Sequence, residues 1–190
     1  MKSELFETEI NYMKNERYKK NAAILINLLP DYFFEVAASS TGKYHPRFAQ
    51  GTGGLVRHTK VAVRIAYEIL EGIVGDSFKQ EEKDLLLLAL ILHDGLKHGK
   101  EKEKYVRFDH PILAADFVKE QQDKTDFSDN EIKFLYHVIA SHMGKFTTSN
   151  YSDVVLPLPK DKYQKFVHMC DMLASRKFLD VEFEGNNIIG

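Results

Sequence analysis

Cysteine is almost absent from this chain of 190 residues, since Cys170 is the only one. A single cysteine excludes an intramolecular disulfide and any cysteine-rich zinc site, and it fits a protein of the reducing cytoplasm. Long apolar runs are lacking too, because the longest, from Leu85 to Leu92, falls far short of the roughly twenty residues of a membrane helix. The N-terminal stretch MKSELFETEI is acidic and has no apolar signal core. The net charge of −2 is not the strongly basic balance of a dedicated nucleic-acid binder.

What the chain does have is ordinary globular composition, with 44% hydrophobic and 28% charged residues. A chain of this length can bury a core without cross-links. Its apolar residues recur at helical spacing almost throughout, and no run requires a strand, so we predict an all-α fold of about seven helices. The expected helices cover 3–29 (one or two helices), 55–74, 80–94, 111 onward, 129–142 and 160–179. The expected loops are 39–54, 95–109 and 144–159.

Two helix starts have clear local signals. Pro111 suits the first position of a helix, where its missing N–H is not needed. Ser128 and Glu131 stand three apart and form a capping box, in which each side chain satisfies a backbone N–H at the helix end. We therefore expect one helix to begin at Pro111 and another to follow Ser128.

Several histidines and aspartates fall on helix faces that are otherwise apolar. His58 shares a face with Ala62 and Ile65, for example, and His93 ends the apolar run of its helix. One such residue is most often a hydrogen-bonded or ion-paired core residue. Six of them point inward from five helices or helix ends, namely His58, His93, Asp94, His110, His142 and Asp171.

A metal centre accounts for these six residues together. A buried carboxylate is costly unless it is paired or bound to a cation, and imidazole nitrogen is a common metal ligand. No cysteine joins the set, so the donors are nitrogen and oxygen. We therefore expect a divalent metal, one of Mn, Fe, Co, Ni or Zn, with Mg open for the oxygen-rich part.

The same residues, in this order, resemble the HD superfamily of metal-dependent phosphohydrolases over about residues 50–180. Residues 53–59, Gly-Gly-Leu-Val-Arg-His-Thr, look like the family's opening motif. Residues 88–94 look like its helix ending in His-Asp, and 141–144 and 171–176 look like the segments that supply a later histidine and the closing aspartate. The resemblance extends to the HD module of certain bacterial 3′→5′ exoribonucleases, without their OB domain. It implies one domain over 1–190, with N-terminal helices in 1–40 and a tail at 181–190.

The resemblance also implies a binuclear centre. The first metal would be held by His58, His93, Asp94 and Asp171, and the second by the bridging Asp94 with His110 and His142. Mononuclear members lack the last two histidines. Many members have His-Asp-x-Gly-Lys, whereas here the glycine, Gly95, comes one position earlier and Lys97 alone keeps its spacing.

The reaction implied is hydrolysis of a nucleotide or related phosphoester by a metal-activated water, with Asp94 and Lys97 as catalytic residues. A bound metal lowers the pKa of water from 15.7 toward about 7, and nearby cations stabilise charge on phosphorus. Besides Lys97, the expected substrate contacts are Lys60, Arg176 and Arg57, for each of which a solvated surface charge is the alternative. Loop 97–107 carries five positive and two negative charges and could cover the site, or could simply be solvated.

Some further residues could line the site. Five aromatic residues could stack on a base or serve only in packing: Tyr44, Phe48, Tyr105, Phe108 and Phe146. His45, with Lys43 and Arg47, could line the entrance.

Three functions remain open from the residues. A stand-alone domain of near-neutral charge favours a small nucleotide-like substrate. The alternative is a 3′→5′ exonuclease or a cyclic-nucleotide phosphodiesterase on the same site, with nucleic acid as the partner, although the Gly-Tyr-Pro motif of HD-GYP phosphodiesterases is not found. The third is a non-catalytic regulatory HD domain, which should have lost ligands. We expect no membrane partner and a homo-oligomer.

Overall fold

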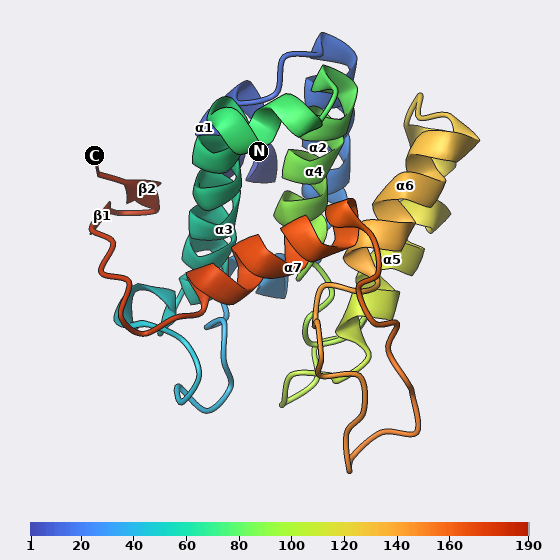
Figure 1. The fold of residues 1–190 in the computed structure, drawn as a ribbon. Helices are drawn as coiled ribbons and strands as arrows, with labels where there is room; N and C mark the ends of the chain where they lie inside the picture. Colours follow the sequence, from blue (N-terminus) through green and yellow to red (C-terminus); the bar gives the residue numbers. More distant parts are fainter. Residues whose placement is uncertain (190) are drawn as a thin grey trace.

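The computed structural model, which describes residues 1–189, is mainly helical and contains seven α-helices and five 3-10 helices (Figure 1). The α-helices are α1 (Glu7–Asn11), α2 (Glu16–Leu28), α3 (Gly54–Glu71), α4 (Gln80–Leu92), α5 (His110–Glu120), α6 (Asp129–Ile139) and α7 (Lys162–Ala174). The 3-10 helices are η1 (Lys2–Phe6), η2 (Asp31–Phe34), η3 (Arg47–Ala49), η4 (Ile73–Ser77) and η5 (Gln122–Lys124). Strands β1 (Phe183–Glu184) and β2 (Asn187–Ile188) form a small antiparallel hairpin. The predicted all-α fold is confirmed.

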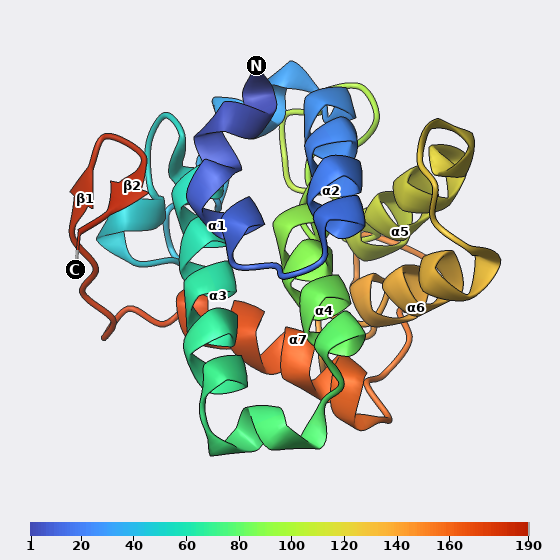
Figure 2. The same ribbon diagram turned by 90° about the horizontal axis from the view of Figure 1, so that it is seen from above.

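Helix α4 is the central element of the hydrophobic core. Every residue of its apolar run, Leu85 to Leu92, is buried. It contacts α2, α3, α6 and α7, and the view in Figure 2 places it between α3 and α6. Each leucine buried in this way contributes about 1.5–3 kcal/mol relative to exposure. Because other helices surround α4 on several sides, His93 and Asp94, which follow its last residue, are buried inside the protein.

Helix α7 crosses the lower parts of α3 and α4 in the view of Figure 1 and contacts both helices. Its start carries a capping arrangement like that of α6, with Asp161 accepting from the backbone of Tyr163 and Gln164. The box predicted at Ser128 is present, with Glu131 reaching back to the backbone N–H of Ser128. Helix α7 therefore brings a late part of the chain against α3, α4 and α6.

Several helix boundaries differ from the predicted ones, and α4 for example ends at Leu92 instead of residue 94. Helix α3 ends at Glu71 because Gly72 is extended and starts the 3-10 turn η4. Helix α6 ends at Ile139, so His142 lies in the following turn and not in the helix. Helix α7 ends at Ala174, five residues before its predicted end, and Phe178 beyond it is 77% exposed. The hairpin in the tail was not predicted, since two-residue strands leave no recognisable alternation.

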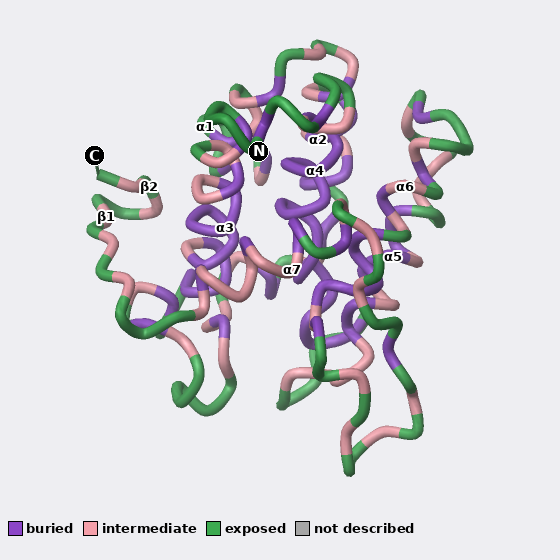
Figure 3. The backbone as a smooth tube through the Cα atoms, in the orientation of Figure 1, coloured by how far each residue is buried: buried purple, intermediate pink, exposed green. Residues whose placement is uncertain are grey.

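Three loops project from the same end of the molecule (Figures 1 and 3). We call them the rim loops and define them as residues 39–50, 97–107 and 144–160. Their tips are exposed, whereas the helix surfaces that face one another are buried (Figure 3). Within residues 1–189, no helix has both the length and the apolar character needed to cross a membrane.

Candidate metal centre

The six histidines and aspartates singled out above converge behind the rim loops. His58 lies one turn inside α3, His93 and Asp94 follow the last residue of α4, and His110 is the first residue of α5. His142 lies three residues beyond α6, and Asp171 is in α7. They form two groups that share Asp94, and in each group the possible ligand atoms all lie within 4.8 Å of one another.

The first group consists of His58, His93, Asp94 and Asp171. The Nε2 atom of His58 lies 3.0 Å from Asp171 Oδ1 and 3.7 Å from Asp94 Oδ2. The Nε2 atom of His93 lies 3.3 Å from Asp94 Oδ2 and 3.4 Å from Asp171 Oδ1. Two imidazoles and two carboxylates therefore face one point, which is a nitrogen and oxygen donor set suited to a divalent cation.

The second group consists of Asp94, His110 and His142. Here the carboxylate presents its other oxygen, since Asp94 Oδ1 lies 3.1 Å from His110 Nε2 and 3.6 Å from His142 Nε2. The two imidazole Nε2 atoms are 3.1 Å apart. Asp94 thus turns Oδ2 toward one pair of histidines and Oδ1 toward the other, as a bridging carboxylate would.

Three of the four histidines are held in one tautomer by the same local contact. The Nδ1–H of His93 donates to Leu90 O (2.7 Å), that of His110 to Arg107 O (2.6 Å) and that of His142 to Ile139 O (2.8 Å). A carbonyl can only accept, so each Nδ1 carries the hydrogen and each neutral ring keeps a lone pair on Nε2. Such contacts orient metal-ligating histidines in known sites.

Buried polar atoms without partners show that a cation fits this donor set. His93 Nε2 and Asp94 Oδ1 are both buried and make no hydrogen bond. An unpaired buried acceptor costs about 1–3 kcal/mol, and more when it is charged. The Lys97 ammonium contacts Asp94 Oδ2 and supplies one positive charge to the cluster. The buried His/Asp groups can hold metal ions, and their assignment as ligands stays a prediction.

The electrostatics of the cluster follow from burial and close charges. Burial acts to raise the pKa of Asp94, but Lys97 and His93 outweigh it and hold that pKa well below its usual value. Burial also opposes ionisation of Asp171, yet the hydrogen-bonded His58 ring and the nearby His93 ring keep its pKa low. Burial acts to lower the pKa of His93, but the two carboxylates raise it to about 10. Burial lowers the pKa of His142 to about 4. The cluster therefore holds two carboxylates that attract positive charge.

Two other histidines support the cluster. His168 donates its Nδ1–H to the backbone carbonyl of His142 (2.7 Å) and packs against Gly144. His45, on the first rim loop, stands edge-on to His58 with the ring centroids 4.8 Å apart, and its Nδ1 is buried without a partner. Burial lowers the pKa of His45 to about 3. The sequence suggested His45 only as an entrance residue, because a histidine in a loop has no periodic pattern that predicts its contacts.

Of the four predicted substrate contacts, only Lys97 contacts a residue of the cluster. Lys97 lies in the cluster, beside Asp94. The Arg57 guanidinium instead donates to the carbonyls of Phe48, Gln50 and Thr52, so it fixes the backbone of 48–52.

Lys60 is almost fully buried and pairs with Glu9 of α1. Arg176 is exposed and donates to Met172 O at the end of α7. The contacts of Arg57 and Lys60 are internal to the protein, so substrate contact by either is not supported by their positions. Cys170 is buried, and its burial raises the pKa of the thiol.

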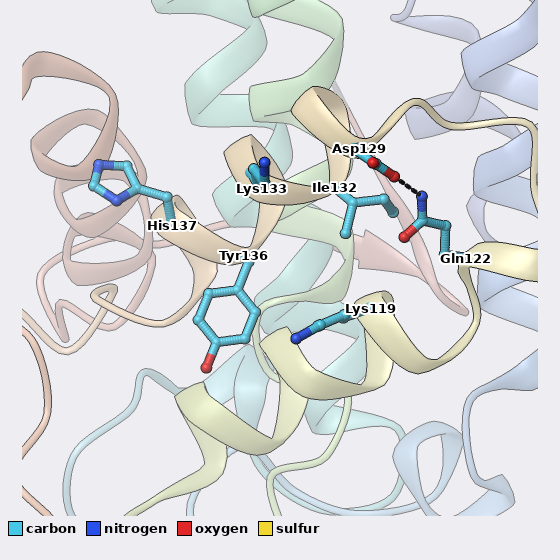
Figure 4. A pocket seen from close by; sticks show the side chains of 7 residues that line it. All are labelled: Lys119, Gln122, Asp129, Ile132, Lys133, Tyr136 and His137. Atoms are coloured by element: carbon cyan, nitrogen blue, oxygen red, sulfur yellow. Dashed lines mark hydrogen bonds between the residues drawn. The ribbon is translucent and has the colours of Figure 1, made fainter.

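A separate hollow of about 460 Å³ lies between α5 and α6 (Figure 4). Lys119 and Tyr136 point into the same space there, and Gln122 donates to Asp129 (2.7 Å) at one side. Its lining includes none of the six clustered residues. The hollow is therefore distinct from the candidate metal centre.

One curated protein is similar to this chain, the 3′-5′ exoribonuclease YhaM of Listeria welshimeri serovar 6b. The two are 25% identical over 177 residues, which is 88% of this chain and 52% of that protein. The chain therefore spans about half the length of the relative that it matches. No family model matches the chain, and no solved structure gives a significant match.

Proposed function

We propose that the cluster binds two divalent metal ions and hydrolyses a phosphoester of a nucleotide or nucleic acid. The proposal rests mainly on the orientation of the Asp94 carboxylate. Its Oδ2 atom faces His93, and its Oδ1 atom faces His110. A single buried carboxylate between two sets of imidazoles is the arrangement that two neighbouring cations need. The first metal would be held by His58, His93, Asp94 and Asp171, and the second by Asp94, His110 and His142.

When bound, divalent metals at such a centre supply an activated water at neutral pH and neutralise charge on the phosphate. The chain's own residues do the rest. The carbonyl contacts of His93, His110 and His142 fix the imidazoles before substrate arrives, so little reorganisation is needed. Lys97 contacts Asp94, and its ammonium would be free to bind a phosphate oxygen once metal cations replace its charge on that carboxylate.

The substrate has two candidates. A mononucleotide fits the near-neutral net charge of the chain, which is −2. A nucleic-acid phosphodiester is favoured by the similarity to an exoribonuclease, although the chain covers about half of that protein. Both use the same chemistry at phosphorus, so the first experiment has to test hydrolysis itself.

That experiment is turnover by the full chain loaded with Mn²⁺ or Fe²⁺, with a nucleotide panel and bis(p-nitrophenyl) phosphate as substrates. Metal-dependent release of phosphate or nitrophenol is expected, and chelation should abolish it. If two metal ions are bound per chain and no phosphoester in the panel is hydrolysed, the proposal is contradicted and a regulatory role is favoured.

A further inference from the structure

Each rim loop carries an exposed lysine followed directly by an exposed aromatic residue. The pairs are Lys43-Tyr44, Lys104-Tyr105 and Lys145-Phe146. The three aromatic residues are 73%, 60% and 57% exposed, in that order. In two pairs the ammonium lies over the neighbouring ring, at 5.2 Å for Lys104 and 5.8 Å for Lys145. These three rings differ in exposure from Phe48 and Phe108, which are partly buried.

The rim loops concentrate the positive charge of the chain. They contain nine lysines and arginines against three acidic residues, which gives them a net charge of +6. Because the net charge of the whole chain is −2, the remaining residues together carry −8. Three of the nine are paired, since Lys97 meets Asp94, Lys100 meets Glu120 and Arg107 meets Glu103. The other six have no carboxylate within 4.0 Å in residues 1–189: Lys43, Arg47, Lys102, Lys104, Lys145 and Lys160.

The rim loops also border the candidate metal centre. The second loop joins Asp94 to His110, and the third leads from His142 toward α7. The first loop packs His45 against His58 and is linked to the second loop, because Val106 N donates to Ser40 Oγ (3.4 Å). All three project from one end of the molecule (Figure 1). The lysine–aromatic pairs therefore lie on the loops that adjoin the cluster.

We infer that the rim loops bind single-stranded nucleic acid, with each lysine–aromatic pair holding one nucleotide unit. A single strand offers a phosphate for the ammonium and an unstacked base for the ring, and both contacts are independent of sequence. A mononucleotide could occupy one pair only, whereas three pairs on three loops require a chain of nucleotides. The inference rests on the proposed function, since it names the substrate class of that centre.

Binding is tested with the full, metal-loaded chain and a fluorescent 2′-O-methyl phosphorothioate decamer, which resists hydrolysis, by fluorescence anisotropy. The triple variant Tyr44→Ala/Tyr105→Ala/Phe146→Ala should raise the Kd at least about tenfold, because each base–aromatic stack contributes to affinity. The variant Lys43→Ala/Lys104→Ala/Lys145→Ala should reduce the slope of log K against log salt by about 2, for three lost phosphate contacts. All six positions are exposed, so both variants should fold.

Matched controls come from exposed residues of η4 and its junction with α4. Ile73→Ala removes a side chain from a residue that is 90% exposed, and Lys79→Ala removes an exposed lysine. Neither should change the Kd or the salt dependence. An equal Kd for duplex and single strand would overturn the inference, because bases inside a duplex cannot stack on the rings. Binding to phosphatidylglycerol vesicles without decamer binding would also overturn it and would identify an anionic lipid surface.

The failure of this inference differs from the failure of the proposed function. A wild-type chain that hydrolyses bis(p-nitrophenyl) phosphate but does not bind the decamer overturns the inference and leaves the hydrolytic centre standing. Decamer binding that is lost in the triple variant, in a chain that hydrolyses no phosphoester, supports the binding surface and overturns the hydrolytic function.

Discussion

The Nε2 atoms of His110 and His142 lie 3.1 Å apart, although each ring already donates its Nδ1–H to a backbone carbonyl. Two neutral imidazoles in this tautomer turn lone pairs toward each other, which is favourable only when a proton or a cation lies between them. Both also face Asp94 Oδ1, which has no hydrogen-bond partner. A cation at this position would satisfy all three atoms.

Removing either histidine of this pair should empty one metal position and leave the other. His110→Ala and His142→Ala are each expected to bind one metal per chain by elemental analysis and to lose at least about 100-fold in turnover, more than the loss of an outer contact causes. His137→Ala is the control, because His137 is exposed on α6 and pairs with Asp161. Variants that keep two metals would show that the pair is not a ligand set.

The buried pair of Lys60 and Glu9 should matter for stability and not for substrate. Their charged atoms lie 3.2 Å apart, and burial raises the pKa of Glu9. Lys60→Met and Glu9→Gln should each lower the free energy of unfolding by about 3–5 kcal/mol, because each leaves a buried polar group without its partner, while the double variant should recover much of the loss. Denaturant unfolding measures both effects. A folded Lys60→Met protein with a raised KM would restore Lys60 as a substrate contact.

Replacing Gly144 should destabilise the protein more than replacing Gly42, because only Gly144 lies against another side chain. Both have a φ of +65°, but a Cβ on Gly144 would lie 2.1 Å from His168 Cε1, whereas nothing lies within 4 Å of a Cβ on Gly42. Gly42→Ala should cost about 1–2 kcal/mol for its backbone conformation alone. Gly144→Ala should cost about 1–3 kcal/mol more and should lower metal occupancy, since His168 holds the carbonyl of His142. Equal losses in the two variants would remove His168 from the support of the site.

Glu131 should give the fold part of its acid sensitivity. Burial acts to raise its pKa, but hydrogen bonds from Arg17 and Tyr18 outweigh burial and lower it from 4.5 to about 2. A lowered pKa means that the ionised form stabilises the fold above about pH 4.5 and that this stabilisation, up to about 3 kcal/mol, is lost as the pH falls toward 2. Unfolding of wild type and Glu131→Gln should differ at pH 7 and converge near pH 2. A difference that is the same at every pH would contradict the ion-pair origin.

The fold and most of the cluster could be predicted from sequence because both depend on local periodicity. The apolar run of α4 and the capping box at Ser128 give helix positions directly, and a polar residue on an apolar face stands out against that pattern. Helix ends could not be predicted as well. The early end of α6 depends on tertiary packing that places His142 in a turn, and no pattern in residues 139–142 signals it.

The partners of long charged side chains could not be predicted from the sequence. Lys60 is two positions from His58 on α3, yet it points to Glu9 of α1, far away in the chain. Arg57 is fixed by three carbonyls of the preceding loop, which only the folded backbone brings together. Lys97 contacts Asp94, a partner that its spacing in the sequence did not predict.

The bridging role of Asp94 is the central claim, and metal content of the Asp94→Asn protein tests it most directly. Asparagine keeps the shape of the side chain and removes the charge that both proposed metals share, and Asp153→Asn, on an exposed loop, is the control. After loading with Mn²⁺ and desalting, elemental analysis should give two metals per chain for wild type and the control and none for folded, helical Asp94→Asn. Two metals retained by Asp94→Asn, or none bound by wild type, would contradict the two-metal centre.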